Sequence, residues 1–397
     1  MKIGIYGGTF NPPHLGHVTA GRMASEILGL DRLYFVPTGT PPHKSLPEGS
    51  PTGEQRLEMT RLALAQTGLE DRAQVLDIEV SRPGRSYTED TVAEIAALHP
   101  GDTLWLLMGT DMFLTFQRWK DPERILSMAG IAAFGRTEAD TEELFTPQRI
   151  WLHRKWPQAR IFTMTLPGVV DVSSTQVRQQ LSRGGGGRYL PPAVYGYLLR
   201  KGLYGTKADL KHLPFSQLRP VALSHLHPRR MPHVLGTEQE AICLAVRYGG
   251  DVEKARRAAL LHDCTKRLSP EEHFQICEQY GIELGIERQN HKLLHAVTGA
   301  AVAREVYGAD REMEDAIRYH TTGRAHMGLL EKILYLADYI EPSRDFPGVD
   351  KLRAACYEDL DEGLRLGLAM SVQELTARGE AVHGATLEAL EAVRKKR

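Results

Sequence analysis

The chain has 397 residues, of which 42% are hydrophobic and 25% charged, and its formal net charge is -1. This length can bury ordinary cores and suggests two or three domains, and the near-zero charge gives no overall attraction to nucleic acid or to an anionic membrane. No apolar run approaches the roughly 18 residues of a membrane span, and the N-terminus lacks the order of a signal peptide, so we expect a cytoplasmic protein with neither kind of partner.

Apolar, strand-like runs alternate with helical patterns up to about residue 205. The runs expected to form strands are residues 2–6, 32–38, 74–80, 103–109, 131–135 and 160–166. Amphipathic segments at residues 54–68 and 88–99 lie between them. This alternation predicts a Rossmann-like α/β domain, a doubly wound parallel sheet with helices on both faces.

The sequence changes character after residue 205. Residues 206–220 carry two prolines and no clean periodicity, so we interpret them as a linker between domains at 1–205 and 221–397. Almost every later segment has a helical pattern, which predicts an all-α bundle. Eleven of the 16 histidines follow residue 205, so this half is enriched in groups that bind metals or carry protons.

The segment GGTFNPPHLGH, residues 7–17, follows the first predicted strand and leads into a helix. Gly7 and Gly8 let the backbone approach an anion, and a helix start offers free backbone N–H groups. His14 and His17 lie one helical turn apart and would both donate hydrogen bonds to phosphate oxygens. The segment has the pattern of neither a P-loop nor a dinucleotide fingerprint. It predicts a site for a nucleoside triphosphate.

GGTFNPPHLGH resembles the HxGH signature of the nucleotidyltransferase superfamily. Further segments narrow the resemblance to bacterial nicotinate-mononucleotide adenylyltransferases; these are VPTGTPPHKS, RPGRSYTEDT, GTD at 109–111 with QRW ending at Trp119, and VSSTQVR at 172–178. The resemblance spans residues 1–205. It implies transfer of the adenylyl group of ATP to nicotinate mononucleotide, with release of pyrophosphate, as a step of NAD biosynthesis.

The same resemblance assigns roles on the ATP side of this site. His14 and His17 would hold the triphosphate and stabilise the transition state, with Mg²⁺ on the phosphates. The other ATP-binding residues would be Gly7, Gly8, Thr9, Phe10, Lys44, Ser173, Ser174, Thr175 and Arg178. A solvated loop lysine is the alternative interpretation of Lys44.

The mononucleotide would lie on the other side. By resemblance, backbone N–H groups at Tyr87 and Thr88 would meet the nicotinate carboxylate, and Trp119 would stack on the pyridine ring. Simple core packing is the alternative for Trp119. Asp111 follows a predicted strand at the edge where open parallel sheets bind ligands, so we expect it to contact the ribose.

The helical half contains LLHDCTK, which places His262 and Asp263 together at the end of an apolar helix, where both could reach one cation. Asp338 interrupts the apolar run ILYLADYI, and a buried carboxylate is unfavourable without a partner or a metal. The candidate metal ligands are His233, His262, Asp263, His295, His320 and Asp338. Nitrogen and oxygen ligands without sulfur suit a pair of ions among Fe, Mn, Mg and Zn, and satisfied polar residues of a core are the alternative.

This order of ligands is similar to that of the HD-domain phosphohydrolase superfamily. HVLGT, HTTG and LLEKILYLADYIEPSRDFPGVDKLR resemble the bacterial subgroup that splits diadenosine tetraphosphate symmetrically into two ADP. The resemblance covers about residues 220–375. It implies one metal site at His233, His262, Asp263 and Asp338 and a second completed by His295 and His320, with iron favoured and the ions activating a water.

We also expect three cationic side chains of the helical half to contact the substrate. Lys266 would steady the charge that develops on the substrate. Arg324 and Arg344 would grip distal phosphates, although solvated surface charges explain both equally well.

We therefore expect a bifunctional enzyme acting on ATP, nicotinate mononucleotide and diadenosine tetraphosphate, for which a homodimer is one option. The alternative is a second domain that only binds a nucleotide as a regulatory module, or acts on another nucleotide phosphate. A first half that only senses nucleotides is the non-enzymatic alternative for that domain.

Overall fold

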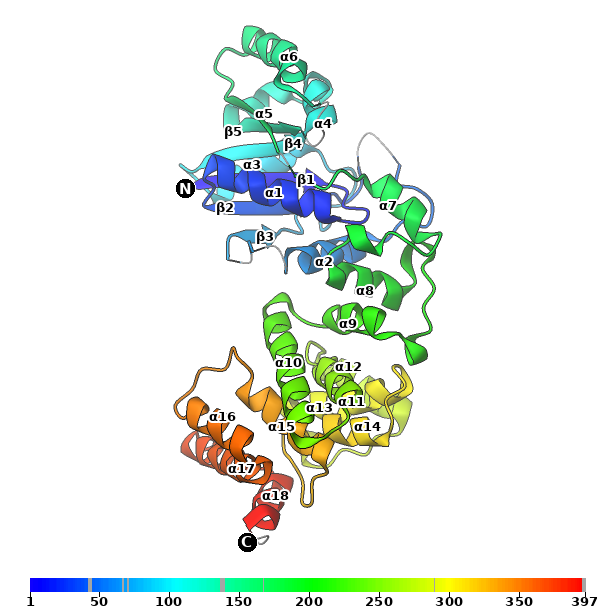
Figure 1. Ribbon diagram of the computed structural model, residues 1–397. Coiled ribbons are helices and arrows are strands. Elements are labelled where there is room, and N and C mark those ends of the chain that lie inside the picture. Colours follow the sequence, from blue (N-terminus) through cyan, green and yellow to red (C-terminus); the bar gives the residue numbers. More distant parts are fainter. Residues whose placement is uncertain are drawn as a thin grey trace. The chain divides into compact units, whose positions relative to one another are not determined.

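The computed structural model describes residues 1–41, 45–65, 68–69, 71–135, 140–166, 168–288 and 290–394. The chain divides into two compact units, Met1–Lys207 and Ala208–Arg397 (Figure 1). Within the stretch interpreted as a linker, the second unit already has a 3₁₀ turn at Leu210–His212 and the start of α9 (Phe215–Leu223). None of the helices in the described part combines the length and apolarity that crossing a membrane requires.

The first unit is built on a six-stranded parallel sheet of order β3-β2-β1-β4-β5-β6. The strands are β1 (Lys2–Gly8), β2 (Arg32–Pro37), β3 (Ala73–Val75), β4 (Thr103–Gly109), β5 (Ala129–Gly135) and β6 (Ile161–Thr165). The strand order reverses between β1 and β4, so the loops that follow these two strands meet at the topological switch point. This architecture confirms the predicted α/β class.

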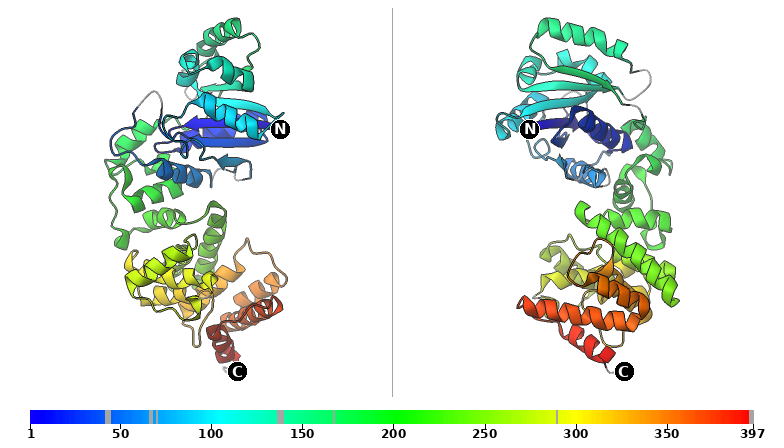
Figure 2. Two further views of the ribbon diagram at one scale, coloured as in Figure 1. Left: turned by 180° about the vertical axis from the view of Figure 1, so that it is seen from behind. Right: turned by 60° about the vertical axis from the view of Figure 1, so that its left-hand side comes forward.

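Helices cover both faces of the sheet (Figure 2). They are α1 (Leu15–Leu28), α2 (Gly53–Leu64), α3 (Thr88–Leu98), α4 (Thr110–Leu114), α5 (Pro122–Met128), α6 (Glu142–Lys155), α7 (Ser174–Leu181) and α8 (Pro192–Lys201). Because strand side chains alternate, Ile3 and Ile5 pack with α3, α5 and α6, whereas Tyr6 packs with α1. The sheet is therefore buried on both sides, as expected for parallel strands.

The prediction for the third strand was too long. The expected strand at residues 74–80 ends at Val75, apart from one further backbone bond from Leu76 to Phe35 O. The chain then turns, with the Ser81 amide donating to Asp77 O at 2.8 Å. The Glu79 side chain is buried and accepts a hydrogen bond from the Thr91 hydroxyl at 2.8 Å. Because the Glu79 side chain points inward and pairs with α3, this segment does not continue as an edge strand.

The second unit is helical, which confirms the predicted all-α class. Its helices after α9 are α10 (Met231–Tyr248), α11 (Val252–Leu261), α12 (Pro270–Tyr280), α13 (His291–Glu305), α14 (Arg311–Arg318), α15 (Leu329–Ile340), α16 (Val349–Glu358), α17 (Leu360–Ala377) and α18 (Gly384–Arg394). Side-chain caps fix several starts, as where Ser269 and Glu272 form a capping box and Asp310 accepts from the Met313 amide. Helix α10 packs against α11 and α15, and α14 against α11, α13 and α15. These five helices carry the polar cluster described below.

Candidate functional sites

A loop of residues 9–14, here called the histidine loop, joins β1 to α1. His14 is the N-cap of α1 and only 1% exposed, and its backbone N–H donates to His17 Nδ1 at 3.2 Å. The two imidazole rings have centroids 3.7 Å apart. Both lie at the N-terminal end of the helix, where backbone N–H groups and the helix dipole favour an anion.

The close packing around Gly16 explains why a glycine directly precedes His17. A Cβ atom at this position would lie 2.6 Å from Val170 O and 3.0 Å from His14 Nδ1. Any side chain would therefore displace either the backbone at Val170 or the His14 ring. At Gly7, by contrast, a Cβ atom would meet no described atom within 4 Å, so the space beside this part of the backbone is open.

The histidine loop is held through Asn11, which is 2% exposed. Its Oδ1 accepts a hydrogen bond from the Tyr204 hydroxyl at 2.6 Å, and its Nδ2 donates to Ser50 Oγ at 3.0 Å. Tyr204 has a left-handed backbone, with φ of 55°, which is unfavourable for a bulky residue and is found where surrounding contacts impose it. The last turn of the first unit thus fixes the loop that carries His14.

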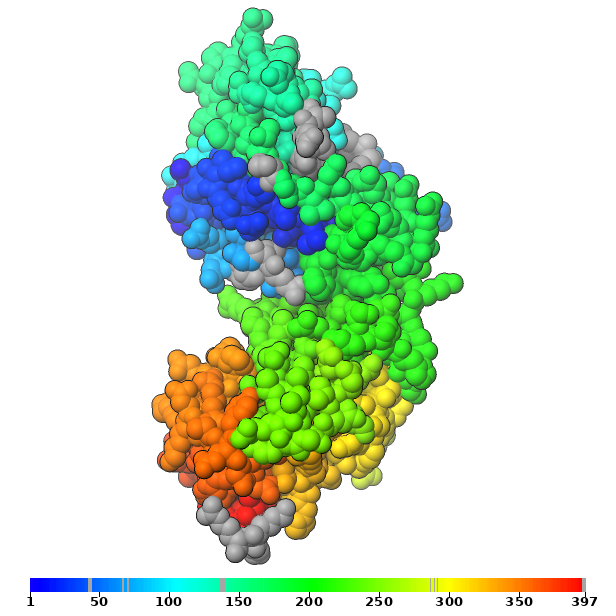
Figure 3. Space-filling model, viewed as in Figure 1, coloured from blue at the N-terminus to red at the C-terminus, as the bar shows by residue number. Residues whose placement is uncertain are grey.

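Helix α7 reaches the same loop, and Figure 3 shows the green surface of this segment beside the blue surface of the N-terminal residues. Ser173 caps α7 by accepting from the Gln176 amide at 3.2 Å. Ser174 Oγ and Arg178 Nη1 donate to main-chain carbonyls of the histidine loop at 3.0 and 2.6 Å, and Arg178 Nη2 donates to Thr175 Oγ1 at 3.0 Å. The predicted ATP-binding residues of α7 and the two histidines are therefore neighbours.

Thr9 and Phe10, which were also predicted to bind ATP, lie in the histidine loop. Phe10 is buried and has φ of 45°, and its ring lies edge-on to His17 with centroids 5.1 Å apart. Thr9 O accepts a hydrogen bond from Arg56 at 2.8 Å. A Cβ atom on Gly8 would lie 3.2 Å from the Phe10 ring. Lys44 lies outside the described residues.

Arg56 is a residue of this site that the sequence did not reveal. It is 1% exposed, and its guanidinium donates to the carbonyls of Thr9, Thr38 and Gly39 at 2.8, 2.6 and 2.9 Å. It thereby joins the loops that follow β1 and β2. Burial lowers the pKa of the guanidinium, although it stays charged. Arginines in amphipathic helices are ordinarily exposed to solvent, so no pattern in the sequence predicted that Arg56 is buried.

The residues predicted to bind the mononucleotide follow β4 or begin α3. Tyr87 is the N-cap of α3 and Thr88 its first residue, so their amides belong to the unsatisfied first turn. Asp111 is exposed in the first turn of α4, immediately after β4. Trp119 is half-buried and packs against Phe116 with ring centroids 5.4 Å apart. One part of the indole thus supports the core and another remains open.

Two cations that the sequence did not single out lie beside the start of α3. Lys120 Nζ sits 4.7 Å from the Tyr87 ring centroid and 3.0 Å from Glu89 Oε2. Arg124 also pairs with the buried carboxylate of Glu89. Glu89 and Asp90 offset these two cations, so the contacts order the start of α3 without giving it a net positive charge.

In the second unit, the structure brings all six predicted metal ligands together. They are His233 on α10, His262 and Asp263 directly after α11, His295 on α13, His320 after α14 and Asp338 on α15. His233 Nε2 lies 2.9 Å from Asp338 Oδ1, and His295 Nε2 lies 3.3 Å from Asp263 Oδ1. Ligand atoms within 4.8 Å of one another form two groups, His233 with His262 and Asp338, and His262 with Asp263 and His320.

The four imidazoles are oriented in the same way. Nδ1 of His262, His295 and His320 lies 2.6, 2.8 and 2.7 Å from the carbonyl of the third preceding residue. Nδ1 of His233 lies 2.9 Å from the carboxylate of Glu341, which also accepts from the Ser343 amide at 2.7 Å. Partners on Nδ1 leave Nε2 to face the centre of the cluster, as in protein metal sites.

The donor set fits a divalent metal ion. Nε2 of His233, Nε2 of His262 and Oδ1 of Asp263 are buried and make no hydrogen bond of acceptable geometry within the described part of the chain. The close neighbours of His233 Nε2 and Asp263 Oδ1 are the other candidate ligands Asp338 and His295, at 2.9 and 3.3 Å. Buried polar atoms rarely stay unsatisfied, and metal ions held by the two groups of ligand atoms would satisfy all three. Burial, together with His262 and His295, lowers the pKa of His320 to about 3, so this imidazole is in its neutral, ligating form near neutral pH.

The two carboxylates are ionised and each binds an arginine. Burial raises the pKa of Asp263, but the adjacent His262 and other histidines hold it well below its usual value. Asp263 Oδ2 accepts a hydrogen bond from Arg230 Nε at 2.6 Å. Asp338 Oδ1 accepts from Arg344 Nη2 at 2.8 Å, so the predicted Arg344 lies at the cluster. Arg230 was not predicted, although it lies three residues before His233.

The other two predicted cations differ in position. Lys266 Nζ lies 3.0 Å from His295 Nε2, and burial lowers the pKa of its ammonium group. Arg324 instead pairs with Glu331 at 2.7 Å and Asp315 at 3.3 Å. Lys266 therefore belongs to the cluster, whereas the guanidinium of Arg324 is engaged by carboxylates outside it.

Comparison with known protein families divides the chain in the same way. Residues 5–180 match the family described as cytidylyltransferase-like. Residues 230–343 match the HD domain. The first match covers the histidine loop and the start of α7, and the second covers all six residues of the metal-ligand cluster.

Curated relatives match each half over nearly their whole length. A protein named probable nicotinate-nucleotide adenylyltransferase from Thermus thermophilus is 38% identical over 205 residues, which are 51% of this chain and 100% of the relative. A symmetrical bis(5'-nucleosyl)-tetraphosphatase from Halalkalibacterium halodurans is 40% identical over 164 residues, 41% of this chain and 88% of the relative. A crystal structure described as a predicted HD superfamily hydrolase involved in NAD metabolism, from Clostridium acetobutylicum, is 40% identical and covers 47% of this chain and 99% of its own, with a TM-score of 0.45.

Proposed function

Because this chain belongs to the nicotinate-nucleotide adenylyltransferases in its first half and to the HD-domain symmetrical bis(5'-nucleosyl)-tetraphosphatases in its second, we propose that it is an enzyme with both activities. The first unit transfers the adenylyl group of ATP to nicotinate mononucleotide. The second hydrolyses diadenosine tetraphosphate to two molecules of ADP.

Adenylyl transfer requires in-line attack of a mononucleotide phosphate oxygen on the α-phosphorus of ATP. The bond between the α-phosphorus and the bridging oxygen breaks, and pyrophosphate leaves. Such a reaction depends mainly on positioning and on neutralising charge. The observation that supports it best is the pair of imidazoles at the start of α1, 3.7 Å apart, where both can donate to the triphosphate. Mg²⁺ on ATP would add further neutralisation.

The second substrate would enter from the side of α3 and β4. Amides at Tyr87 and Thr88 would receive the nicotinate carboxylate, and the open part of Trp119 would stack on the pyridinium ring. Asp111 would hydrogen-bond to the ribose. The loop after β4 lies beside the histidine loop at the switch point between β1 and β4, which supports a site where both substrates would meet at this edge of the sheet.

The hydrolase proposal rests on the six-residue cluster, and above all on its buried atoms without hydrogen-bond partners. Divalent ions bound there would supply Lewis acidity and an activated water, with iron proposed first and manganese, magnesium or zinc as alternatives. The histidines and the two aspartates would hold the ions through Nε2 and carboxylate oxygens. Lys266 would donate to a phosphate oxygen as its charge increases, and Arg344 would bind a neighbouring phosphate.

A panel of substrates tests both activities on the metal-reconstituted full-length protein. ATP with nicotinate mononucleotide should release pyrophosphate, and diadenosine tetraphosphate alone should give two ADP for each molecule consumed. Nicotinamide mononucleotide in parallel reveals the preference for the mononucleotide. Absence of pyrophosphate release would contradict the first activity. Nucleotide binding without ADP formation would instead identify the second unit as a regulatory module.

A further inference from the structure

A pocket in the second unit lies next to the metal-ligand cluster. It has a volume of about 110 Å³ and opens to solvent. Sites that enclose a whole small organic ligand typically measure roughly 300–1,000 Å³, so this pocket would hold only one end of a larger ligand. Tyr319 and Thr321 line it, and these are the chain neighbours of His320 on both sides. Ala296, which directly follows His295, also lines it. The pocket and the cluster therefore share two stretches of backbone.

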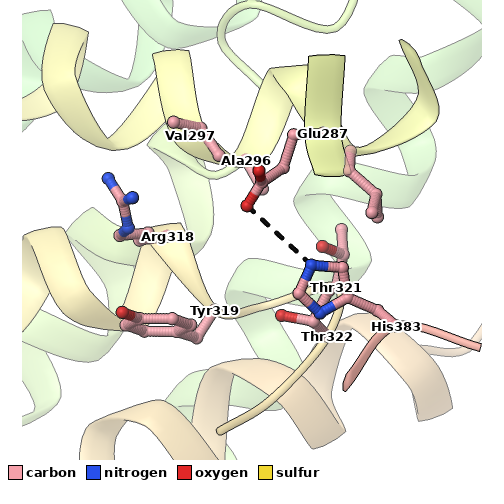
Figure 4. A pocket seen from close by; sticks show the side chains of 9 residues that line it. Glu287, Ala296, Val297, Arg318, Tyr319, Thr321, Thr322 and His383 are labelled. Carbon is pink, nitrogen blue, oxygen red and sulfur yellow. Dashed lines mark ion pairs between the residues drawn. The ribbon is translucent and has the colours of Figure 1, made fainter. Parts of the chain in front are cut away.

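The polar groups of the pocket lie on opposite sides of it (Figure 4). The guanidinium of Arg318, at the end of α14, stands on one side and makes no hydrogen bond or ion pair with another described residue. On the other side, His383 Nε2 lies 3.9 Å from Glu287 Oε1. The Oγ1 atom of Thr321 is buried and has no hydrogen-bond partner in the described part of the chain. A cation and a hydroxyl are thus left for a ligand, and a carboxylate remains within reach.

The remaining walls are apolar or aromatic. Ala296 and Val297 contribute one face of α13. The ring of Tyr319 extends below Arg318 in Figure 4, and the guanidinium of Arg324 lies 4.6 Å from its centroid. Arg324, held by two carboxylates, therefore supports the tyrosine ring. An aromatic ring beside an aliphatic wall suits a planar base, and nearby polar groups suit its edge, a ribose or a phosphate.

We propose that this pocket binds the adenosine at one end of the dinucleoside tetraphosphate, with the base on Tyr319 and Thr321 Oγ1 hydrogen-bonded to the nucleoside. This inference rests on the proposed hydrolase function. In symmetrical hydrolysis, the bond that breaks lies two phosphates away from each adenosine. An adenosine site beside His295 and His320 would set that spacing and so select the central phosphoanhydride bond for the metal-ligand cluster.

Photolabelling with 2-azido-ADP tests the pocket independently of hydrolysis. The probe is titrated into the full-length, manganese-loaded protein, and labelling is quantified on peptides that carry residues 287–297 and 318–322. Measuring these peptides alone distinguishes labelling of this pocket from labelling of any nucleotide site in the first unit. Tyr319→Leu should raise the apparent Kd at these peptides about tenfold, as loss of base stacking typically does. Tyr319→Phe keeps the ring and is the matched control, so it should label like the wild type.

Hydrolysis supplies the second readout. Tyr319→Leu should raise the KM for diadenosine tetraphosphate by a similar factor while kcat and bound metal stay unchanged, and inorganic pyrophosphate, which lacks a nucleoside, should inhibit both proteins equally. Should Tyr319→Leu not fold, Thr321→Val removes only the hydroxyl and should raise the same Kd and KM several-fold.

The possible outcomes distinguish a failure of the pocket assignment from a failure of the proposed hydrolase function. Wild-type levels of labelling and an unchanged KM in Tyr319→Leu and Thr321→Val, or no labelling of these peptides in the wild type, would overturn the pocket assignment even if ADP is formed. Labelling that depends on Tyr319 without any hydrolysis of diadenosine tetraphosphate would support the nucleoside site and overturn the proposed hydrolase.

Discussion

His14 and His17 stand at the start of α1, with the His14 ring buried between the histidine loop and Gly16. Their positions depend on contacts that are made by the backbone and by Asn11, not by the histidines alone. Substitutions at single residues therefore separate the groups that meet the substrate from the groups that hold them in place.

His17→Ala should lower the turnover of adenylyl transfer by a factor on the order of 100 or more, because it removes a donor to the phosphates in the transition state. The fold should persist, since His17 contacts Phe10 at the edge of the core and α1 keeps its other packing. Steady-state kinetics with circular dichroism on the same sample checks this. Near-normal transfer in a folded variant would rule out the proposed role.

Trp119→Ala should raise the KM for nicotinate mononucleotide by about tenfold, equivalent to roughly 1.4 kcal/mol of lost stacking, and leave the KM for ATP similar. The physical reason is that the open part of the indole would meet the pyridinium ring. Separate titrations of the two substrates measure this. Equal losses for both would show that Trp119 acts only by packing against Phe116 and the core.

Tyr204→Phe removes only the hydroxyl that donates to Asn11 at 2.6 Å. Loosening the histidine loop should lower kcat for adenylyl transfer about tenfold and change the KM for ATP little, because a hydrogen bond to a buried group contributes about 1–2 kcal/mol. Stability should fall by a similar amount. Asn11→Ala also removes the bond to Ser50, so in the Tyr204→Phe background it should add only that part of the loss, and the double variant should lose less than the sum of the single variants. Additive effects would show that they act separately.

At the scale of elements, the order of strands and helices could be predicted because each element carries its own periodicity. The six strand positions follow from apolar runs. Apart from differences of one or two residues at strand ends, the predicted strands are wrong only at residues 76–80, where Glu79 turns inward to Thr91 on α3. Both family resemblances, read from local motifs, are confirmed by the matches to each half.

The missed residues act through distant partners. Tyr204 lies 193 residues from Asn11 in the chain, and His233 lies 108 residues from Glu341. Spacing within a motif carries no signal for such pairs. Glu341 could have been suspected, because it lies one turn after Asp338 on the same helix face.

Five helices converge on the metal-ligand cluster, so a bound metal should hold them together. Removing it with a chelator should lower the Tm of the helical unit by roughly 10 °C, because a ligand at about 1,000 times its Kd contributes about 4 kcal/mol to the free energy of unfolding. Differential scanning calorimetry should show this shift in one transition, with the transition of the sheet unit unchanged. Equal Tm values with and without chelator would contradict a structural role of the metal.

The whole molecule consists of two compact units with separate candidate sites. The histidine loop, α3 and α7 lie in the first, and the metal-ligand cluster and the adjacent pocket in the second. Both proposed reactions handle adenine nucleotides, but no residue is shared between the two sites. We therefore expect the two activities to be lost independently.

The most direct test measures both activities in Asp263→Ala and His17→Ala at equal protein concentration. Asp263→Ala removes a carboxylate from the group that shares His262 with the other group of ligand atoms, so it should empty the metal site and abolish ADP formation while nicotinate adenine dinucleotide synthesis persists. His17→Ala should give the reverse pattern. ADP formation by Asp263→Ala without bound metal, or loss of both activities in either folded variant, would contradict the account of two independent enzymes in one chain.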